Sequence, residues 1–370
     1  MRVLHIFNEI KFSGAEIMYV NAAPLFQEGH VDMIAFATGE LPGSYCSYFE
    51  RANIKVIHKP LLKGTKNPFT LLRYFNDVFK FLIKEQIDVI HIHRSTYYCF
   101  FAMVGHIASV KTIRTIHNVF KNRIFTRHFA IMLRLVAKKI FNVKFHTIGE
   151  SVFENEQNYY RNESTVINNW YNDDKFYPAI SRQEKADKRI KLDIHLDSFV
   201  IISTGACTNV KNHEAIINAV SILKGVLPLL YLHLGEGPTC KAEESLTVSL
   251  GCEDIIRFLG NQSNVRDYLI VSDVYVMPSK FEGLSIASIE AMACGLPSVL
   301  YNSPGLKDLI HDNDNGYLIE PDPKILAEKI LILYENKQMA KNMGQAAQQF
   351  VNRKFSMKVG VSKIIELYCS

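Results

Sequence analysis

Short runs of β-branched and other apolar residues alternate along the chain with longer segments in which apolar residues recur at helical spacing. The short runs are typical of strands buried on both faces, and the longer segments are typical of helices that bury one face. Because consecutive parallel strands need a crossover connection, this repeated alternation indicates parallel sheets covered by helices. The pattern therefore predicts an α/β fold.

The predicted strands form two successive sets. In the first part of the chain the apolar runs lie at residues 2–8, 31–38, 55–58, 88–93, 112–117 and 144–148. In the second part they lie at residues 199–204, 229–234, 255–259, 274–277, 298–301 and 316–319. Helices are expected in most of the gaps, most clearly at residues 68–85, and a final helix is expected at about residues 357–368.

A polar stretch separates the two sets. Residues 171–191 contain Asn172-Asp173-Asp174 and a dense series of charges, a composition typical of a linker. A chain of 370 residues is also long for one hydrophobic core and sufficient for two domains. We therefore predict a first domain at residues 1–170, a linker at 171–190 and a second domain at 191–353.

The composition indicates a globular protein of the cytoplasm. Apolar residues make up 48% of the chain and charged residues 21%. The seven cysteines are scattered without a C-x-x-C pair, which favours reduced thiols over a disulfide framework or a zinc site. The chain enters its first predicted strand without a signal-peptide pattern, and no apolar run approaches the roughly 20 residues of a membrane-spanning helix.

Positive charge is concentrated in the first part of the chain. Residues 1–170 hold 21 Lys or Arg and 13 Asp or Glu, a balance of +8, whereas the remaining residues hold 21 and 24, a balance of −3. Much of the excess lies in residues 121–144, where no acid interrupts the basic and apolar residues. The cations of this segment include Arg123, Arg127, Arg134, Lys138 and Lys139.

Two interpretations of residues 121–144 remain open. A basic amphipathic helix can lie on an anionic membrane surface, here the inner face of the cell membrane. Alternatively, its apolar face packs on the sheet and its cations are simply solvated. Nucleic acid is disfavoured as a partner, because the isoelectric point near 8.6 is only mildly basic and no nucleic-acid-binding module is recognised.

The most informative candidate chemistry is a pair of carboxylates, Glu282 and Glu290, on either side of a predicted helix start. The strand at 274–277, the loop with Gly283 and the helix ending before Gly295 form a strand–loop–helix unit. Backbone amides at a helix start attract phosphate, and the carboxylates can accept hydrogen bonds from sugar hydroxyls. The spacing alone is equally compatible with an ordinary βαβ unit that carries two solvated glutamates.

These residues also carry a family resemblance. Glu282, Gly283, Glu290 and the following residues 291–297, Ala-Met-Ala-Cys-Gly-Leu-Pro, resemble the E-x7-E signature of family-four retaining glycosyltransferases of the bacterial surface-polysaccharide type. This family has the GT-B fold, two Rossmann-like domains whose parallel sheets face each other across a cleft, and its C-terminal helix, here residues 354–370, packs back on the first domain. The resemblance extends over much of the chain, through residues 14–16, 88–93, 115–118, 235–238 and 258–260.

The resemblance implies a role for each residue around the glutamates. Glu290 would hold the ribose hydroxyls of a nucleotide, and Glu282 would hold a hydroxyl of the donor sugar. The backbone amides of Gly283, Leu284 and Ser285 would bind the sugar or the distal phosphate.

The resemblance also implies a diphosphate-binding loop that begins at Gly205. Lys211 occupies the position of the family's diphosphate-binding lysine, whereas Ala206 occupies the position of its usual arginine. The missing guanidinium removes a bidentate phosphate donor, so stabilisation of the leaving group would depend more on Lys211 and on helix-start amides.

Three further positions follow from the same resemblance. Gly14 would let the backbone approach the donor phosphates or the acceptor, His117 would contact the transferred sugar, and Gly260 would line the nucleotide site. The family needs no metal ion, so neither a metal nor another cofactor is expected. Asp312-Asn313-Asp314 has the spacing of a D-x-D metal motif, but the following Asn-Gly pair is typical of a turn.

We therefore predict a retaining glycosyltransferase that moves a hexose or N-acetylhexosamine from a nucleotide sugar, with UDP favoured, to a glycan or lipid-linked acceptor. Two alternatives remain open: a non-catalytic GT-B module that binds nucleotide sugar or a partner enzyme, and a nucleotide-sugar epimerase of GT-B fold. A nicotinamide oxidoreductase is disfavoured, because no complete G-x-G-x-x-G motif follows the first strand.

Overall fold

The computed structural model describes residues 1–61, 64–65, 67–119 and 124–370. The chain forms two compact units. The first contains Met1–Trp170 together with Met357–Ser370, and the second contains Tyr171–Ser356. The last segment of the chain therefore belongs to the first unit.

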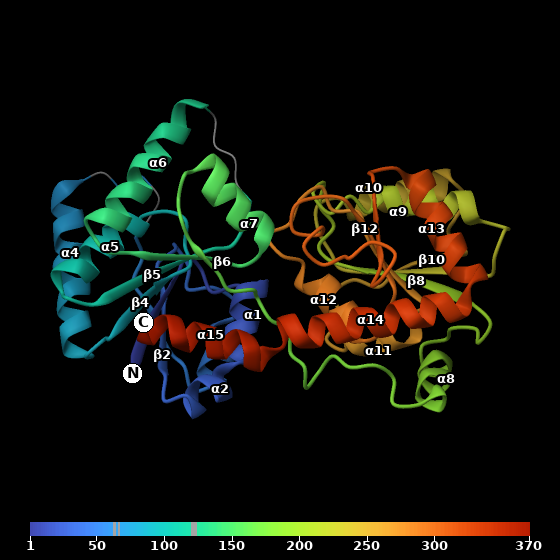
Figure 1. Ribbon diagram of the computed structural model, residues 1–370, viewed down its shortest axis with the longest axis horizontal. Coiled ribbons are helices and arrows are strands. Elements are labelled where there is room, and N and C mark those ends of the chain that lie inside the picture. Colours follow the sequence, from blue (N-terminus) through green and yellow to red (C-terminus); the bar gives the residue numbers. More distant parts are fainter. Residues whose placement is uncertain (62–63, 66, 120–123) are drawn as a thin grey trace. The chain divides into compact units, whose positions relative to one another are not determined.

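The first unit is built on a parallel sheet with the order β3-β2-β1-β4-β5-β6-β7 (Figure 1). Its order reverses at the centre, where β1 pairs with both β2 and β4. In such a sheet, ligands bind outside the carboxyl ends of the strands at this reversal. The strands are β1 (Arg2–Phe7), β2 (Asp32–Ala37), β3 (Lys55–His58), β4 (Val89–Ile92), β5 (Lys111–Ile116), β6 (Lys144–Thr147) and β7 (Thr165–Val166).

Helices cover both faces of this sheet (Figure 1). One face carries α4 (Pro68–Lys84), α5 (Tyr98–Ile107) and α6 (Ile124–Lys139), and α4 starts with Asn67 as a side-chain cap and Pro68 in the first turn. The other face carries α1 (Gly14–Asn21), α2 (Ala23–Glu28) and α15 (Met357–Cys369). The remaining helical segments of the unit are α3 (Cys46–Arg51), α7 (Glu150–Glu154) and the π-helix η1 (Asn155–Tyr159).

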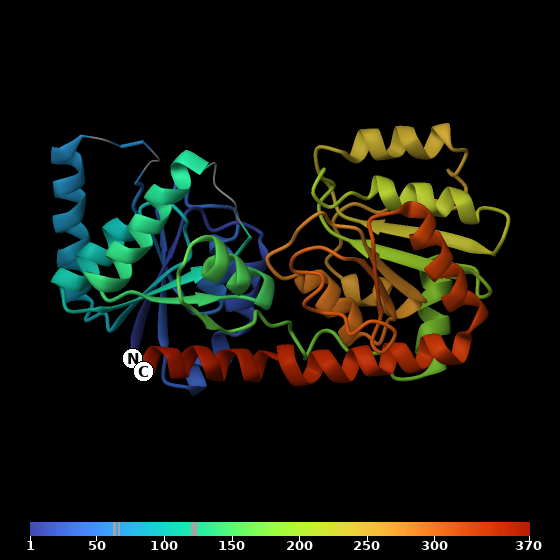
Figure 2. The same ribbon diagram turned by 45° about the horizontal axis from the view of Figure 1, so that its top comes forward.

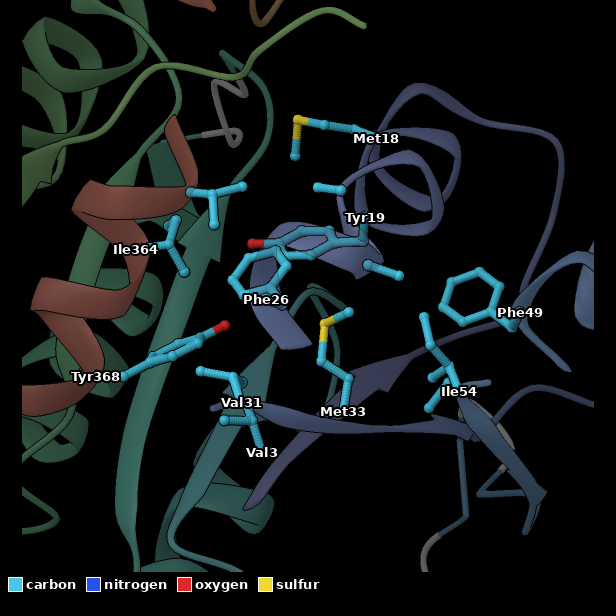
Figure 3. Packing of buried hydrophobic residues seen from close by; sticks show 14 of the residues in the cluster. Val3, Met18, Tyr19, Phe26, Val31, Met33, Phe49, Ile54, Ile364 and Tyr368 are labelled. Carbon is cyan, nitrogen blue, oxygen red and sulfur yellow. The ribbon is translucent and has the colours of Figure 1, made fainter. Parts of the chain in front are cut away.

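The hydrophobic core under α1, α2 and α15 joins the two ends of the chain. Figure 3 shows Tyr19 and Phe26 from the first two helices beside Ile364 and Tyr368 from the last one. All four side chains are at most 2% exposed. Because burial of large apolar side chains is the main source of stability, α15 is an integral part of the first unit.

The second unit repeats the architecture with the order β10-β9-β8-β11-β12-β13 (Figure 2). The order reverses between β8 and β11, and every strand pair is parallel. The strands are β8 (Phe199–Thr204), β9 (Leu229–Leu234), β10 (Ile256–Phe258), β11 (Val274–Met277), β12 (Ser298–Tyr301) and β13 (Tyr317–Ile319).

The helices of the second unit again lie on both faces (Figure 2). The core of one face joins the sheet to α9 and α13 through buried residues such as Ile216, Val220, Leu326 and Ile330. The helices are α8 (Arg182–Lys191), α9 (Glu214–Leu223), α10 (Cys240–Ser249), α11 (Val265–Val271), α12 (Ile286–Ala293), α13 (Pro323–Glu335) and α14 (Lys337–Phe355).

The polar stretch that we predicted as a linker contains a helix, α8. Ser181 caps it by accepting a hydrogen bond from Glu184 N, and Lys188 pairs with Asp267 at 2.7 Å. Arg189 is 6% exposed and donates to three backbone carbonyl groups and a carboxylate of the second unit. The charges of this stretch thus attach a helix to the second unit.

None of the helices in the described ranges has both the length and the apolar character that spanning a membrane requires.

Candidate functional site

The candidate residues of the second unit lie where its sheet order reverses. Gly205 follows β8 and Glu282 follows β11, and these two strands are neighbours at the reversal. The loops after β8 and β9 lie in close contact. A Cβ on Gly235, which has φ +144°, would collide with the carbonyl oxygen of Gly205, so this close approach requires glycine. Gly260 follows β10 and bridges to Gly235, so the predicted glycine loops meet at one edge.

Lys211 and Glu282 form an ion pair at this edge. Lys211 Nζ lies 2.6 Å from Glu282 Oε1, and the side chains are 20% and 15% exposed. The side chain of Lys211 extends over Gly205, where a Cβ would lie 3.3 Å from its Cε. Ser279 Oγ donates to the same Glu282 oxygen at 2.8 Å. A cation and a carboxylate are therefore held together in a partly water-accessible position.

The helix that follows Glu282 starts as the sequence predicts. Ser285 caps α12, and its side chain accepts a hydrogen bond from Ser288 N. Within the described part of the chain, the amides of Gly283, Leu284 and Ser285 donate to no backbone or side-chain acceptor. Three free donors at a helix start, beside Lys211, form an arrangement that binds anions.

Glu290 lies in α12, on the same strand–loop–helix unit. Desolvation by burial raises the pKa of its carboxyl to about 8, and the positive charge of Lys175 opposes this shift. Glu290 is therefore largely protonated at neutral pH, whereas Glu282 is paired with a cation. The two carboxyls differ in environment as well as in position.

The candidate histidine of the first unit ends a row of imidazoles. His117 Nε2 lies 3.1 Å from His93 Nδ1, and His93 Nε2 lies 3.0 Å from His5 Nδ1. Burial lowers the pKa of His117 to about 4 and that of His5 to about 3, so the row is neutral at physiological pH. Since a neutral imidazole donates through one nitrogen and accepts through the other, each hydrogen bond restricts the tautomer of the next ring.

This histidine row was only partly predicted from the sequence. The spacing of His91 and His93, two residues apart on one strand, indicates a shared face of the sheet, and this signal was available. The alignment of His5 beside His91 follows from the pairing of β1 with β4. That pairing becomes visible only in the fold.

Gly14 is the first residue of α1, at the carboxyl edge of β1 and hence at the reversal of the first sheet. Ser13 precedes it and donates a hydrogen bond to Glu16, and burial raises the pKa of the Glu16 carboxyl. Gly14 therefore lies at a helix start beside the reversal point of the first sheet.

The basic segment is less exposed than its sequence suggested. Residues 121–123, including Arg123, lie outside the described residues. Arg134 is 9% exposed, pairs with Glu156 at 2.7 Å and stacks on the ring of Tyr160. Its charge is thus neutralised inside the unit, contrary to our expectation of a solvated or membrane-facing cation. Lys138 pairs with Glu163 at 2.6 Å.

A cavity of about 860 Å³ in the second unit lies away from these residues. It is lined by Phe199, Pro228, Asp273 and Pro297, at the amino ends of strands. Since all the strands are parallel, this is the sheet edge opposite to Glu282 and Lys211. The D-x-D-like residues Asp312, Asn313 and Asp314 form a turn closed by a bridge between Asp312 and Gly316.

Comparisons with known proteins bear on the family and the fold of the chain. Residues 184–350 match the family model described as "Glycosyl transferases group 1". The chain is 25% identical over 309 residues to N-acetyl-alpha-D-glucosaminyl L-malate synthase of Bacillus anthracis, an alignment that covers 77% of this chain and 75% of that protein. It is 24% identical over 304 residues to the UDP-Gal:alpha-D-GlcNAc-diphosphoundecaprenol alpha-1,3-galactosyltransferase of Escherichia coli, covering 79% and 77%.

The solved structures include a similar chain with a bound nucleotide. Anabaena Alr3699/HepE in complex with UDP superimposes with a TM-score of 0.85 at 18% identity, over 100% of both chains. At this identity the likeness shows the fold alone. It confirms the predicted fold class, two Rossmann-like domains of the GT-B type.

Proposed function

We propose that this chain, a group 1 glycosyltransferase with the GT-B fold, transfers a hexose or N-acetylhexosamine from a UDP-sugar to a hydroxyl group of a glycan or lipid-linked acceptor. The observation that carries the proposal is the Lys211–Glu282 ion pair beside the free amides at the start of α12. The lysine and the amides suit a diphosphate, and the carboxylate suits the hydroxyls of the attached sugar.

The donor would bind to the second unit through side chains, backbone amides and glycine positions at this edge of the sheet. Lys211 and the amides of residues 283–285 would take the diphosphate, and Glu282 would accept from a sugar hydroxyl. Glu290 would bind the ribose, and Gly205 and Gly260 would let the nucleotide approach the backbone. The UDP preference draws on the UDP-bound structural neighbour and on the UDP-Gal enzyme among the relatives.

In the proposed reaction, the bond between the anomeric carbon and the diphosphate breaks while the acceptor oxygen bonds to the same carbon with retention. The leaving diphosphate takes up the bonding electrons, and one of its oxygens takes the proton that the acceptor hydroxyl releases. Lys211 and the α12 amides stabilise the charge that develops on the diphosphate, which is the usual task of a metal ion in metal-dependent transferases. We therefore propose that this step needs no metal ion.

In the first unit, we propose that His117 contacts the transferred sugar and that Gly14 lets the backbone approach the donor or the acceptor. A neutral imidazole can donate to a hydroxyl without adding charge. The hydrogen bond to His93 would fix which nitrogen of His117 remains for the substrate.

We also propose a peripheral contact of α6 with the anionic inner face of the cell membrane. Phe129, Met132 and Leu135 recur at helical spacing and are 59%, 48% and 48% exposed. Lys139 at the end of the helix is exposed as well. An apolar face with neighbouring cations suits a lipid surface, and a lipid-linked acceptor would be reached there.

A non-catalytic nucleotide-sugar-binding module is the second candidate, and one observation favours it. Ala206 supplies no side-chain charge to the diphosphate loop, so Lys211 is the cation of that loop, and in the described structure it is already paired with Glu282. In this case UDP-sugar would bind without being consumed.

The proposal is tested by calorimetric titration of the purified chain with UDP-, GDP-, ADP- and dTDP-sugars, each measured with and without a brief exposure to EDTA. We expect micromolar binding of a UDP-sugar that is unaffected by the chelator. Release of UDP in the presence of acceptor lipid extracts separates the enzyme from the binding module. If none of the nucleotide sugars binds, the donor-site assignment is wrong.

A further inference from the structure

The second unit contains a buried cluster of four potential metal ligands that the proposed reaction does not use. Cys207 lies in the loop after β8, His213 precedes α9, His233 lies in β9 and Glu243 lies in α10. One donor atom from each residue lies within 4.8 Å of all the others. The four residues are between 0% and 4% exposed.

The distances within this cluster are too long for ordinary hydrogen bonds between nitrogen and oxygen. Glu243 Oε2 lies 3.7 Å from His213 Nδ1 and 3.5 Å from His233 Nδ1. Cys207 Sγ lies 3.7 Å from His233 Nε2. A tetrahedral zinc ion with bonds of about 2.0 to 2.3 Å places its ligand atoms roughly 3.3 to 3.8 Å apart, and the two distances from Glu243 to the histidines fall in this range. The Cys207 distance is to the other nitrogen of His233, but one donor atom from each of the four residues lies within 4.8 Å of the rest.

Several polar atoms of the two histidines and of Glu243 also lack a hydrogen-bond partner among the described residues, whereas Cys207 Sγ lies within weak hydrogen-bond distance of His233 Nε2 and of the Gly235 carbonyl oxygen. Within the described part of the chain, both ring nitrogens of His213, Nδ1 of His233 and Oε2 of Glu243 are buried without a hydrogen bond. Buried polar groups without a partner are costly and therefore rare, so four such atoms on three neighbouring side chains call for an explanation. A bound cation would satisfy one atom of each residue.

The histidines of the first unit provide an internal comparison. His5, His91 and His93 are also close enough to bind a metal ion. Their facing nitrogens, however, are joined to neighbours at 2.6 to 3.1 Å, including Tyr368, Thr115 and His117. Normal hydrogen bonds join the rings of that group, although His5 Nε2 is buried without a partner in the described ranges, whereas no hydrogen bond joins Glu243 Oε2 to the two histidines it faces.

We propose that Cys207, His213, His233 and Glu243 bind one structural Zn²⁺ ion. A thiolate, two imidazoles and a carboxylate are zinc ligands, and four protein ligands leave no position for substrate, as in structural sites. Thr239 Oγ1 donates to Glu243 Oε1 at 2.7 Å, which leaves Oε2 to face the histidines. A cavity of about 170 Å³ reaches His213 and Glu243 and provides an entry path.

The ion would fix the loop that carries Lys211. In the chain, Cys207 precedes Lys211 and His213 follows it, so the two ligands lie at either end of this loop. His233 and Glu243 belong to β9 and α10. Zinc would therefore tie the loop to the sheet and to a covering helix. It would position Lys211 and take no part in the chemical step.

The test is the zinc content of the chain purified without a polyhistidine tag, compared with Cys207→Ser and His213→Gln variants. We expect about one zinc ion per native chain and well under half of that in both variants. Cys252→Ser is the matched control, because Cys252 is also fully buried but lies outside the cluster. Prolonged chelation should lower the thermal midpoint of the native chain and of the control, and added Zn²⁺ should restore it.

Replacement of Zn²⁺ by Co²⁺ in the native chain gives a second measurement, which does not depend on whether the variants fold. The native chain should show a thiolate-to-cobalt charge-transfer band, which reports the Cys207 sulfur directly. A native chain that holds no zinc after growth in zinc-supplemented medium, and takes up neither Zn²⁺ nor Co²⁺ afterwards, would overturn the proposal. So would full zinc retention in both ligand variants.

Discussion

At the scale of single residues, the environment separates side chains that look alike in the sequence. Glu282 and Glu290 belong to one motif, but Glu282 is paired with Lys211 and Glu290 is held in a desolvated position that raises its pKa to about 8. The sequence predicts the position of both carboxyls after β11. It does not predict the direct contact with Lys211, because that contact depends on the pairing of β8 with β11.

Removal of the Glu282 carboxylate tests its role in transfer. We expect Glu282→Ala to lower kcat/KM for donor turnover at least about tenfold, equivalent to about 1.4 kcal/mol of transition-state stabilisation. Lys211→Met should act similarly, and the double variant should lose less than the sum, because the two side chains share one interaction. Lys241→Met, an exposed lysine of α10, is the control and should match the native rate. Native kinetics in both single variants would contradict the site.

The raised pKa of Glu290 predicts the sign of a pH effect on stability. Between the ordinary carboxyl pKa and about 8, the folded chain keeps a proton that the unfolded chain has released. The free energy of unfolding should therefore fall as the pH rises through this window. Urea unfolding at several pH values should show a smaller decrease for Glu290→Gln than for the native chain. An identical pH dependence in both proteins would show that Glu290 titrates normally.

At the scale of secondary structure, the strands were predicted best. Apolar runs such as 199–204, 229–234 and 274–277 have the same bounds in the structure, because burial on both faces leaves a nearly continuous apolar signal. The two-residue strand β7 was not predicted, since so short a segment carries no periodicity. Helix α8 was missed because its stability comes from ion pairs and from Arg189 rather than from an apolar face.

The proposed contact with an anionic membrane surface depends on helix α6. Replacement of Phe129 and Met132 by serine should reduce sedimentation of the chain with anionic vesicles at low salt, because these side chains supply exposed apolar area. Ile180→Ser together with Ile190→Ser is the matched control, since both residues are exposed but belong to the second unit. If the native chain never sediments with vesicles, the proposed contact does not exist.

At the scale of the whole molecule, the two-sheet architecture was predictable from the sequence and the proposed zinc site was not. The architecture follows from the alternation of strand and helix patterns. The four proposed zinc ligands are dispersed over residues 207–243 without the spacing of a known zinc motif, so only the fold brings them together. For the same reason we had expected Cys207 to be an unliganded thiol.

The shared core of the first unit leads to a prediction about truncation. Deletion of residues 357–370 removes Ile364 and Tyr368 from their contacts with Tyr19 and Phe26. We expect the truncated chain to lose the cooperative unfolding transition of the first unit while the second unit still unfolds at its own midpoint. Calorimetry measures both transitions, and addition of the missing segment as a peptide should partly restore the first. Two unchanged transitions would contradict the assignment of α15.

Because the chain returns to its first unit through Met357–Ser370, the two units become complete at different times during translation. A ribosome makes Met1–Trp170 first, but this segment lacks α15 until Met357–Ser370 has been translated and has left the exit tunnel. The continuous second unit, Tyr171–Ser356, can close its core earlier. During this interval the nascent first unit exposes the apolar face that α15 covers in the folded chain.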